Sequence, residues 1–185
     1  LADLMTILEH KRRLRGLTLA YLGDGLNNVT HSLLLAAARV GLHMRVGCPD
    51  APAYRPDPAV VARARRLAAR SGSQITITCD ARAAVRGADV VYTDSWMSYH
   101  IPADQLEERR VRFAPYQVTA SLMRRAQRGA IFLHCLPATR GYEVTGEVID
   151  GPQSVVLDEA ENRLHVHKAV LLHLVAGVET PVRRS

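Results

Sequence analysis

The chain has 185 residues, of which 48% are hydrophobic and 23% charged, and its formal net charge is +6 at pH 7. This balance is typical of a globular protein with a core, and it excludes a disordered or fibrous chain. No apolar run approaches the roughly 18 residues of a membrane span, and arginine clusters such as 109–112 are typical of solvated helix faces. We therefore expect no membrane and no nucleic acid as a partner, whereas an anionic substrate would suit the positive charge.

Hydrophobic periodicity and cap signals predict alternating strands and helices. The strands, each short and apolar, are expected at 18–22, 43–48, 74–79, 89–93 and 130–134. The helices are expected at 2–14, 58–71, 81–87, 103–111, 119–127 and 159–176, with a further one that ends at Gly41. Such alternation predicts an α/β fold: a single domain whose doubly wound, Rossmann-like parallel sheet carries helices on both faces.

Polar segments follow three of the predicted strands. They are residues 23–28 after the first strand, 94–98 after the fourth and 134–137 after the fifth. Because the carboxyl ends of parallel strands lie at one edge of a sheet, these segments are expected to meet there. Residues 158–163, at the start of the last helix, add an acidic run and an arginine. A small-molecule site is therefore expected at this edge.

The segment His134-Cys135-Leu136-Pro137 places a thiol and an imidazole directly after a buried strand. A free cysteine inside a strand is usually part of the core. A cysteine just beyond the carboxyl end of a strand lies where open α/β proteins bind their ligands. Together with the other polar segments, this placement makes Cys135 a candidate catalytic residue.

The glycines at 23 and 25 resemble the start of a dinucleotide-binding fingerprint. The third glycine of that pattern is replaced by Asn28, and Cys48-Pro49 ends the second strand where an acidic residue would hold a ribose. A nicotinamide or flavin site is therefore disfavoured. The adjacent asparagines Asn27 and Asn28 offer amide groups to a carboxylate at a helix start, whereas simple N-capping would need only one of them.

Two further residues carry both a functional and a structural interpretation. Asp94 ends an apolar strand, where its carboxylate is placed to receive an ammonium group with help from Ser98, although either residue would serve as a helix cap. Arg163 can aim a planar guanidinium at a carbonyl or phosphate oxygen. The alternative for Arg163 is a surface pair with Glu159, one helical turn earlier. Trp96, the only tryptophan, either walls a pocket or packs in the core.

The cysteines at 48, 79 and 135 are odd in number and far apart in the sequence. This spacing excludes a disulfide framework and a CxxC metal site, and it favours a reducing cytoplasm. His165 and His167 lack a nearby third ligand, so packing or surface roles are expected for them rather than a metal site.

Taken together and in this order, the four segments resemble the ornithine-binding half of the ornithine carbamoyltransferase family. Residues 23–32 (GDGLNNVTHS) resemble its GD..NN...S loop, and residues 93–98 (TDSWMS) its TD.W.S loop. Residues 134–137 match its HCLP motif, and residues 158–165 resemble its EAENR helix. Residues 1–7 (LADLMTI) are similar to the helix that joins the two domains of this family.

The resemblance implies transfer of a carbamoyl group from carbamoyl phosphate to the δ-amine of L-ornithine. The products would be L-citrulline and phosphate, as in arginine biosynthesis, with no cofactor and no metal required. By similarity, Asn28 would bind the carboxylate of the amino acid, while Asp94 and Ser98 would bind its α-amino group.

For the chemical step, the resemblance implies that Cys135 lies beside the attacking amine and that Leu136 offers its backbone carbonyl to the carbamoyl nitrogen. Arg163 would stabilise the carbonyl oxygen as it gains charge. An amine that attacks a carbamoyl carbon creates an oxyanion, and preorganised cationic donors usually supply the largest stabilising term for such a charge. These roles therefore agree with the physical chemistry of the reaction.

The chain departs from the ornithine type after the TD.W.S loop, where Tyr99-His100 stands in place of Met-Gly. The change removes the conformational freedom of a glycine and adds bulk to a loop expected to close on the amine, so Tyr99 is a candidate substrate-binding residue. Putrescine, lysine or a modified ornithine are alternative substrates, although the retained α-amino-acid contacts favour ornithine. A non-catalytic amino-acid-binding module on the same fold is a further alternative.

The family's carbamoyl-phosphate domain, with its STRTR motif, is not in this sequence. The resemblance thus implies that the chain is part of a longer enzyme and is inactive alone. We expect an inter-domain helix at 1–15, an amino-acid-binding domain at 16–160, a C-terminal helix at 161–180 returning toward the absent domain, and a tail at 181–185. The whole enzyme is expected to be a cytoplasmic homotrimer or a multiple of trimers.

Overall fold

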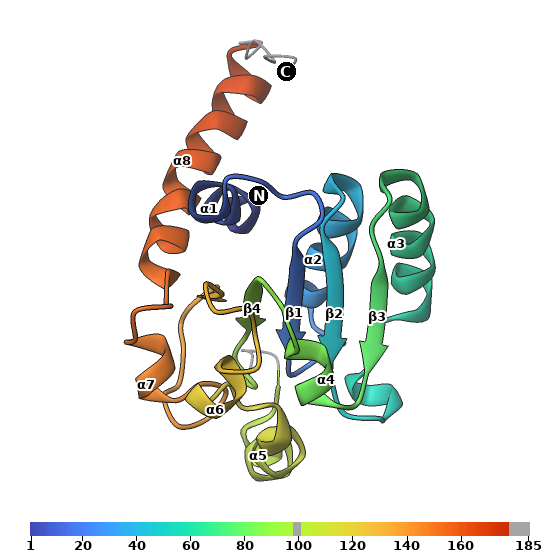
Figure 1. Ribbon diagram of the computed structural model, residues 1–185, viewed down its shortest axis with the longest axis vertical. Coiled ribbons are helices and arrows are strands. Elements are labelled where there is room, and N and C mark those ends of the chain that lie inside the picture. Colours follow the sequence, from blue (N-terminus) through green and yellow to red (C-terminus); the bar gives the residue numbers. More distant parts are fainter. Residues whose placement is uncertain (98–100, 178–185) are drawn as a thin grey trace.

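The computed structural model describes residues 1–97 and 101–177 (Figure 1). Its strands are β1 (Thr18–Leu22), β2 (His43–Gly47), β3 (Ile75–Thr78), β4 (Val90–Thr93) and β5 (Ile131–His134). They form one sheet in the order β3-β2-β1-β4-β5, and all four neighbouring pairs are parallel. The predicted parallel α/β sheet is confirmed.

The α-helices are α1 (Ala2–Lys11), α2 (Asn28–Val40), α3 (Pro58–Ser71), α4 (Ala81–Val85), α5 (Leu106–Phe113), α6 (Ala120–Met123), α7 (Gly146–Ile149) and α8 (Val156–Val175). Short 3-10 turns lie at Pro52–Tyr54, Ala103–Gln105 and Ala114–Tyr116. Apolar side chains of α2 and α3 pack on one face of the sheet, and those of α4, α5, α6 and α7 pack on the other. The sheet is therefore doubly wound, as predicted.

Local signals set several of these boundaries. Asp57 accepts hydrogen bonds from the first backbone N–H groups of α3, and Pro58 follows it at the first helical position, as expected. Gly41 ends α2 with a φ of 80°, a conformation that glycine adopts without a steric penalty. Helix α1 stops at Lys11, not at 14, because Arg12 turns into the left-handed region with a φ of 62°.

The helix predicted at 103–111 is shifted, because residues 103–105 form a 3-10 turn and α5 continues to Phe113. The helix predicted at 119–127 was too long, because α6 ends at Met123. Beyond it the backbone bonds to a different part of the chain: Gln127 N–H donates to the Ala88 carbonyl, and the Arg125 carbonyl accepts from Gly87 N–H, both at 2.9 Å. Tertiary hydrogen bonds thus replace the helical ones there.

The order of the strands places a topological switch point between β1 and β4. From β1 the chain winds outward through β2 to β3, and it then returns to β4 on the other side of β1. The segments that follow β1 and β4 therefore leave toward opposite faces and open a crevice between them. In open α/β sheets, ligands bind in this crevice beyond the carboxyl ends of the strands.

Helices α1 and α8 pack against each other beside the sheet (Figure 1). The Asn162 side chain on α8 donates to Thr6 Oγ1 at 2.9 Å and to Glu9 Oε2 at 2.7 Å, both on α1. The C-terminal half of α8 projects beyond the rest of the fold and carries exposed leucine and valine side chains. Within the described residues, no helix has the length and apolar character needed to cross a membrane.

Candidate functional site

The segments that follow β1, β4 and β5 meet at the switch point, as the sequence predicts. Asp94, directly after β4, joins them. Its Oδ2 accepts a hydrogen bond from Asn27 Nδ2 at 2.8 Å, and its Oδ1 accepts one from the Cys135 thiol at 2.9 Å. One half-buried carboxylate thus links three loops that are distant in the sequence.

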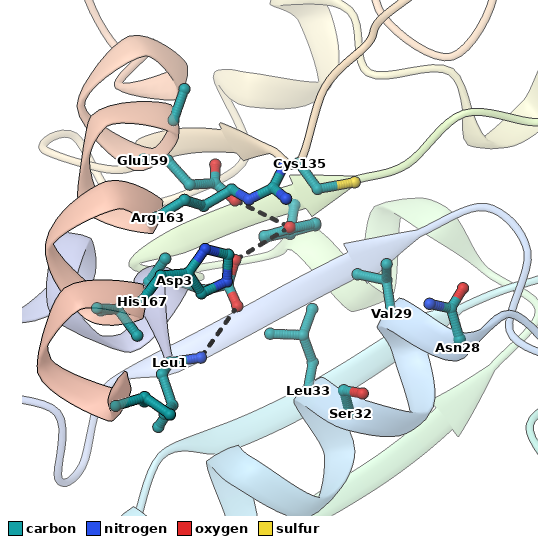
Figure 2. A pocket seen from close by; sticks show the side chains of 15 residues that line it. Leu1, Asp3, Asn28, Val29, Ser32, Leu33, Cys135, Glu159, Arg163 and His167 are labelled. Carbon is teal, nitrogen blue, oxygen red and sulfur yellow. Dashed lines mark hydrogen bonds and ion pairs between the residues drawn. The ribbon is translucent and has the colours of Figure 1, made fainter. Parts of the chain in front are cut away.

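A cavity of about 360 Å³ lies beside these loops (Figure 2). This volume is within the range of about 300–1,000 Å³ common for small-molecule sites. Figure 2 shows Asn28 and Ser32 of α2 on one side and Glu159 and Arg163 of α8 on the other, with Cys135 between them. Of the predicted site residues, the structure thus brings Asn28, Cys135 and Arg163 around one cavity. Ser98 and Tyr99 lie outside the described residues.

The two adjacent asparagines have different roles: one caps α2 and the other lines the cavity. Asn27 is the N-cap of α2: its Oδ1 accepts from Thr30 N–H at 2.8 Å, and its Nδ2 donates to Tyr21 and Asp94. All of its polar atoms are therefore engaged within the fold. Asn28 is exposed, is not needed as the cap, and lines the cavity. Its amide group is therefore available to a ligand at the N-terminus of α2, where the helix dipole favours a carboxylate.

The carboxylate of Asp94 is held without a cationic partner among the described residues. Besides Asn27 and Cys135, it accepts the backbone N–H of Ser95 at 2.7 Å. No α-helix begins next to Asp94 in the described part of the chain, so the helix-cap interpretation is wrong. An anionic carboxylate fixed by three donors at the edge of a crevice suits an incoming ammonium group.

Burial raises the pKa of the Cys135 thiol far above its usual range, and the neighbouring Asp94 carboxylate raises it further, since a thiolate there would face a second negative charge. Cys135 therefore remains a neutral thiol at physiological pH. A neutral thiol that donates a hydrogen bond is a poor nucleophile, so the site is not built for covalent catalysis by this cysteine.

Glu159 is a residue that the sequence reasoning missed. The alternative interpretation of Arg163 placed it on the helix surface, but it is only 2% exposed. Its carboxylate instead accepts from the Tyr92 hydroxyl at 2.9 Å and from His134 N–H at 3.0 Å. Burial, followed by the nearby Asp3 carboxylate, raises the pKa of Glu159 to about 8. Its place within the EAENR segment was the only signal available.

The alternative interpretation of Arg163, a surface pair with Glu159, is therefore wrong. Arg163 is exposed, and within residues 1–97 and 101–177 its guanidinium makes no ion pair. Figure 2 shows its side chain extending from α8 across the cavity, alongside Glu159 and near Cys135. A free guanidinium in this position can bind an oxygen that carries or gains negative charge.

Leu136 adopts a φ of 51°, in the left-handed region that a branched aliphatic side chain rarely enters. The conformation is held by its N–H, which donates to His134 Nδ1 at 2.9 Å. His134 is fully buried, and its Nε2 faces the buried Glu143 carboxylate at 3.4 Å. This imidazole therefore shapes the turn after β5 and does not line the cavity.

Asp94, His134 and Cys135 are also the residues that could hold a metal ion, since their ligand atoms lie within 4.8 Å of one another. His134 Nδ1 is, however, engaged with Leu136 N–H, and the Cys135 thiol with Asp94. A cation would have to displace both hydrogen bonds and remove the thiol proton. The arrangement fits a hydrogen-bonded amine site better than a preformed metal site.

The glycines at 23 and 25 have a structural explanation. Gly23 has a φ of 122°, and a side chain at Gly25 would approach Pro56 Cδ and the Tyr54 carbonyl oxygen to 2.7 Å. Gly25 N–H in turn donates to that carbonyl at 2.9 Å. These glycines let the loops after β1 and β2 pack closely, so their pattern carries no indication of a dinucleotide.

Residues 15–174 match the family model for the Asp/Orn-binding domain of aspartate/ornithine carbamoyltransferase. The chain belongs to this family. Curated relatives include the ornithine carbamoyltransferases of Methanobrevibacter smithii, 54% identical over 95% of this chain and 57% of the relative, and of Symbiobacterium thermophilum, 55% identical over 95% and 55%. The chain thus spans somewhat more than half the length of these relatives.

Solved structures agree with this membership. The ornithine carbamoyltransferase from Pyrococcus furiosus superposes with a TM-score of 0.89 at 47% identity, covering 96% of this chain and 56% of that structure. The enzyme from Gloeobacter violaceus gives a TM-score of 0.81 at 50% identity, covering 92% and 55%. The fold described above is thus the fold of the corresponding part of this family.

Proposed function

We propose that the full-length protein containing this chain transfers the carbamoyl group of carbamoyl phosphate to the δ-amine of L-ornithine. The observation that carries the proposal is the convergence, at the switch point of the sheet, of a neutral thiol, an anionic carboxylate and a guanidinium that makes no ion pair with the described residues. Relatives about half identical to this chain carry the name ornithine carbamoyltransferase. In this proposal a carbamoyl-phosphate domain elsewhere in the full-length protein would supply the other half of the active site.

In this proposal the chain binds the two charged groups on the α-carbon of the amino acid. The amide of Asn28 would bind the α-carboxylate, helped by the positive end of the α2 dipole. The Asp94 carboxylate, together with Ser98, would bind the α-ammonium group, and Tyr99 would contact the substrate from the same loop. The side chain of ornithine would then extend toward Cys135, which is hydrogen-bonded to Asp94.

The chemical step forms a bond between the δ-nitrogen and the carbamoyl carbon and breaks the bond from that carbon to the phosphate oxygen. The attacking amine must be neutral, and its proton leaves with the phosphate. Cys135, as an uncharged thiol, would orient the amine nitrogen without repelling or protonating it. Arg163 would donate to the carbonyl oxygen as charge develops there, and Leu136 would accept from the carbamoyl NH₂ through its carbonyl.

We assign α1 and the C-terminal part of α8 to the junction with the rest of the enzyme. The exposed apolar side chains of α8 include Leu171, Leu174 and Val175, which are 60%, 73% and 81% exposed. Such a contiguous apolar helix face is typical of a surface that another domain covers.

We further propose that the enzyme is a homotrimer or a multiple of trimers. The three cysteines of this chain form no disulfide with one another, which suits a reducing cytoplasm.

The test is citrulline formation from carbamoyl phosphate and L-ornithine by the full-length enzyme. Arg163→Ala should lower kcat by roughly 10²–10³-fold, the usual cost of removing one oxyanion donor. Arg66→Ala, on the outer face of α3, is the matched control and should leave kcat unchanged. Wild-type protein that forms no citrulline, or an Arg163→Ala variant as active as the control, would refute the proposed function.

A further inference from the structure

Arg109 on α5 is a buried cation outside the cavity. The sequence predicts that the arginines of residues 109–112 lie on a solvated helix face, and this prediction is wrong for Arg109 only. Arg110 and Arg112 are exposed, whereas Arg109 is 7% exposed. An arginine is almost never buried unless its charge is paired, so its partners indicate what its burial achieves.

Apart from Phe113 on its own helix, the partners of Arg109 belong to loops at the carboxyl edge of the sheet. Its Nη2 donates to the buried Asp24 carboxylate, in the loop after β1. Its Nε donates to the Trp96 backbone carbonyl at 2.6 Å, in the loop after β4. Its guanidinium carbon lies 5.5 Å from the centre of the Tyr54 ring, in the loop after β2, and 4.9 Å from that of Phe113.

Two of these partners, Asp24 and Trp96, belong to the loops that carry the site residues Asn28 and Asp94. Asp24 Oδ1 accepts from Leu26 N–H at 2.9 Å, and the Asp24 carbonyl accepts from the Thr30 hydroxyl, so Asp24 shapes the turn that begins α2. Trp96 is two residues beyond Asp94 in the other substrate loop. The fixed fork of a guanidinium holds two acceptors at a set separation, which an ammonium group cannot do. Arg109 therefore fixes the distance between these two loops.

We propose that Arg109 is a positioning residue for the amino-acid substrate: it holds the Asp24–Asn28 turn and the Asp94–Trp96 loop at the separation that lets them bind the α-carboxylate and the α-ammonium group of ornithine. This inference rests on the proposed function. It concerns the second substrate only, because none of these contacts involves Arg163 or the turn after β5.

The experiment compares Arg109→Lys with Arg110→Lys in the full-length enzyme. Arg110 is the neighbouring arginine, 56% exposed and 3.7 Å from Glu107, and is the matched control. We expect Arg109→Lys to raise KM for ornithine by roughly 10- to 100-fold, because a misplacement of about 1 Å has effects of this size. KM for carbamoyl phosphate should change by less than about twofold. Arg110→Lys should match wild type in both constants.

Hydrogen exchange provides a readout that does not depend on turnover. Residues 22–28 and 93–97 should exchange faster together in Arg109→Lys and remain protected in Arg110→Lys. An unchanged ornithine KM in a folded Arg109→Lys enzyme, or equal rises in both KM values, would overturn the positioning role while leaving the proposed function intact. Wild-type enzyme that forms no citrulline would overturn the proposed function first, and this inference with it.

Discussion

Replacing Asp94 by asparagine should weaken ornithine binding selectively. The substitution keeps the size of the side chain and removes the charge that would face the α-ammonium group. A hydrogen bond to a charged group contributes about 1.5–3 kcal/mol, and each 1.4 kcal/mol is a factor of ten, so KM for ornithine should rise by roughly 10- to 150-fold. KM for carbamoyl phosphate should stay near its wild-type value, because in the proposed arrangement Asp94 contacts no part of that substrate.

The same substitution should change the chemistry of Cys135. The Asp94 carboxylate helps to raise the pKa of this thiol, so its removal should lower that pKa and make the thiolate accessible at lower pH. The assay is the pH dependence of Cys135 alkylation by iodoacetamide, followed by mass spectrometry, beside steady-state kinetics. Burial remains the larger cause of the raised pKa, so the profile should shift without reaching that of a free cysteine.

Asp50→Asn is the matched control for Asp94→Asn. Asp50 is an acidic residue in the loop after β2, is 67% exposed, and pairs with Arg55 at 2.9 Å. It should leave both KM values and the alkylation profile unchanged. The reasoning would be refuted if Asp94→Asn left ornithine KM within about twofold of wild type, or if the alkylation profile of Cys135 did not move.

Two further predictions concern the scaffold of the site. Gly25→Ala should destabilise the enzyme by about 1–3 kcal/mol, as overpacking usually does, because the Cβ of the alanine would overlap Pro56 and the Tyr54 carbonyl. Urea denaturation measures this loss of stability, and an unchanged unfolding midpoint would contradict the prediction. Glu159 has a pKa of about 8 in the fold, raised by burial and by Asp3, so the folded state binds more protons than the unfolded state between about pH 4.5 and 8. The contribution of protonated Glu159 to stability is therefore complete below pH 4.5 and is lost as the pH rises through 8. Glu159→Gln should flatten the fall of Tm with pH over that window. A variant with the wild-type slope would contradict the assignment.

Much of the fold was predictable because strands and caps carry local signals. The buried strands read as short apolar runs, and Asp57-Pro58 and Gly41 marked helix ends through their own backbone preferences. The predicted length of a helix was wrong where tertiary hydrogen bonds replace helical ones, as they do after Met123. No local sequence pattern indicates that the backbone groups of Arg125 and Gln127 bond to Gly87 and Ala88.

The candidate site was predictable where residue types follow strand ends. Asn28, Asp94 and Cys135 could be placed at one edge because parallel strands share it. The supporting residues could not be recognised in the same way. Glu159 and Arg109 lie in charged helical runs that read as solvated, and only packing against the sheet and the loops shows that they are buried. Burial of a charged side chain depends on the tertiary structure, which periodicity does not specify.

The central claim is that this sheet edge selects an α-amino acid whose side-chain amine reaches Cys135. The most direct measurement is the ratio of kcat/KM for L-ornithine to that for putrescine, which lacks the α-carboxylate and thereby loses the Asn28 contact. The full-length wild-type enzyme should prefer ornithine by roughly 10-fold or more, the value of one contact to a charged group. An equal or greater kcat/KM for putrescine would contradict the assignment of Asn28 and place the specificity of this enzyme elsewhere.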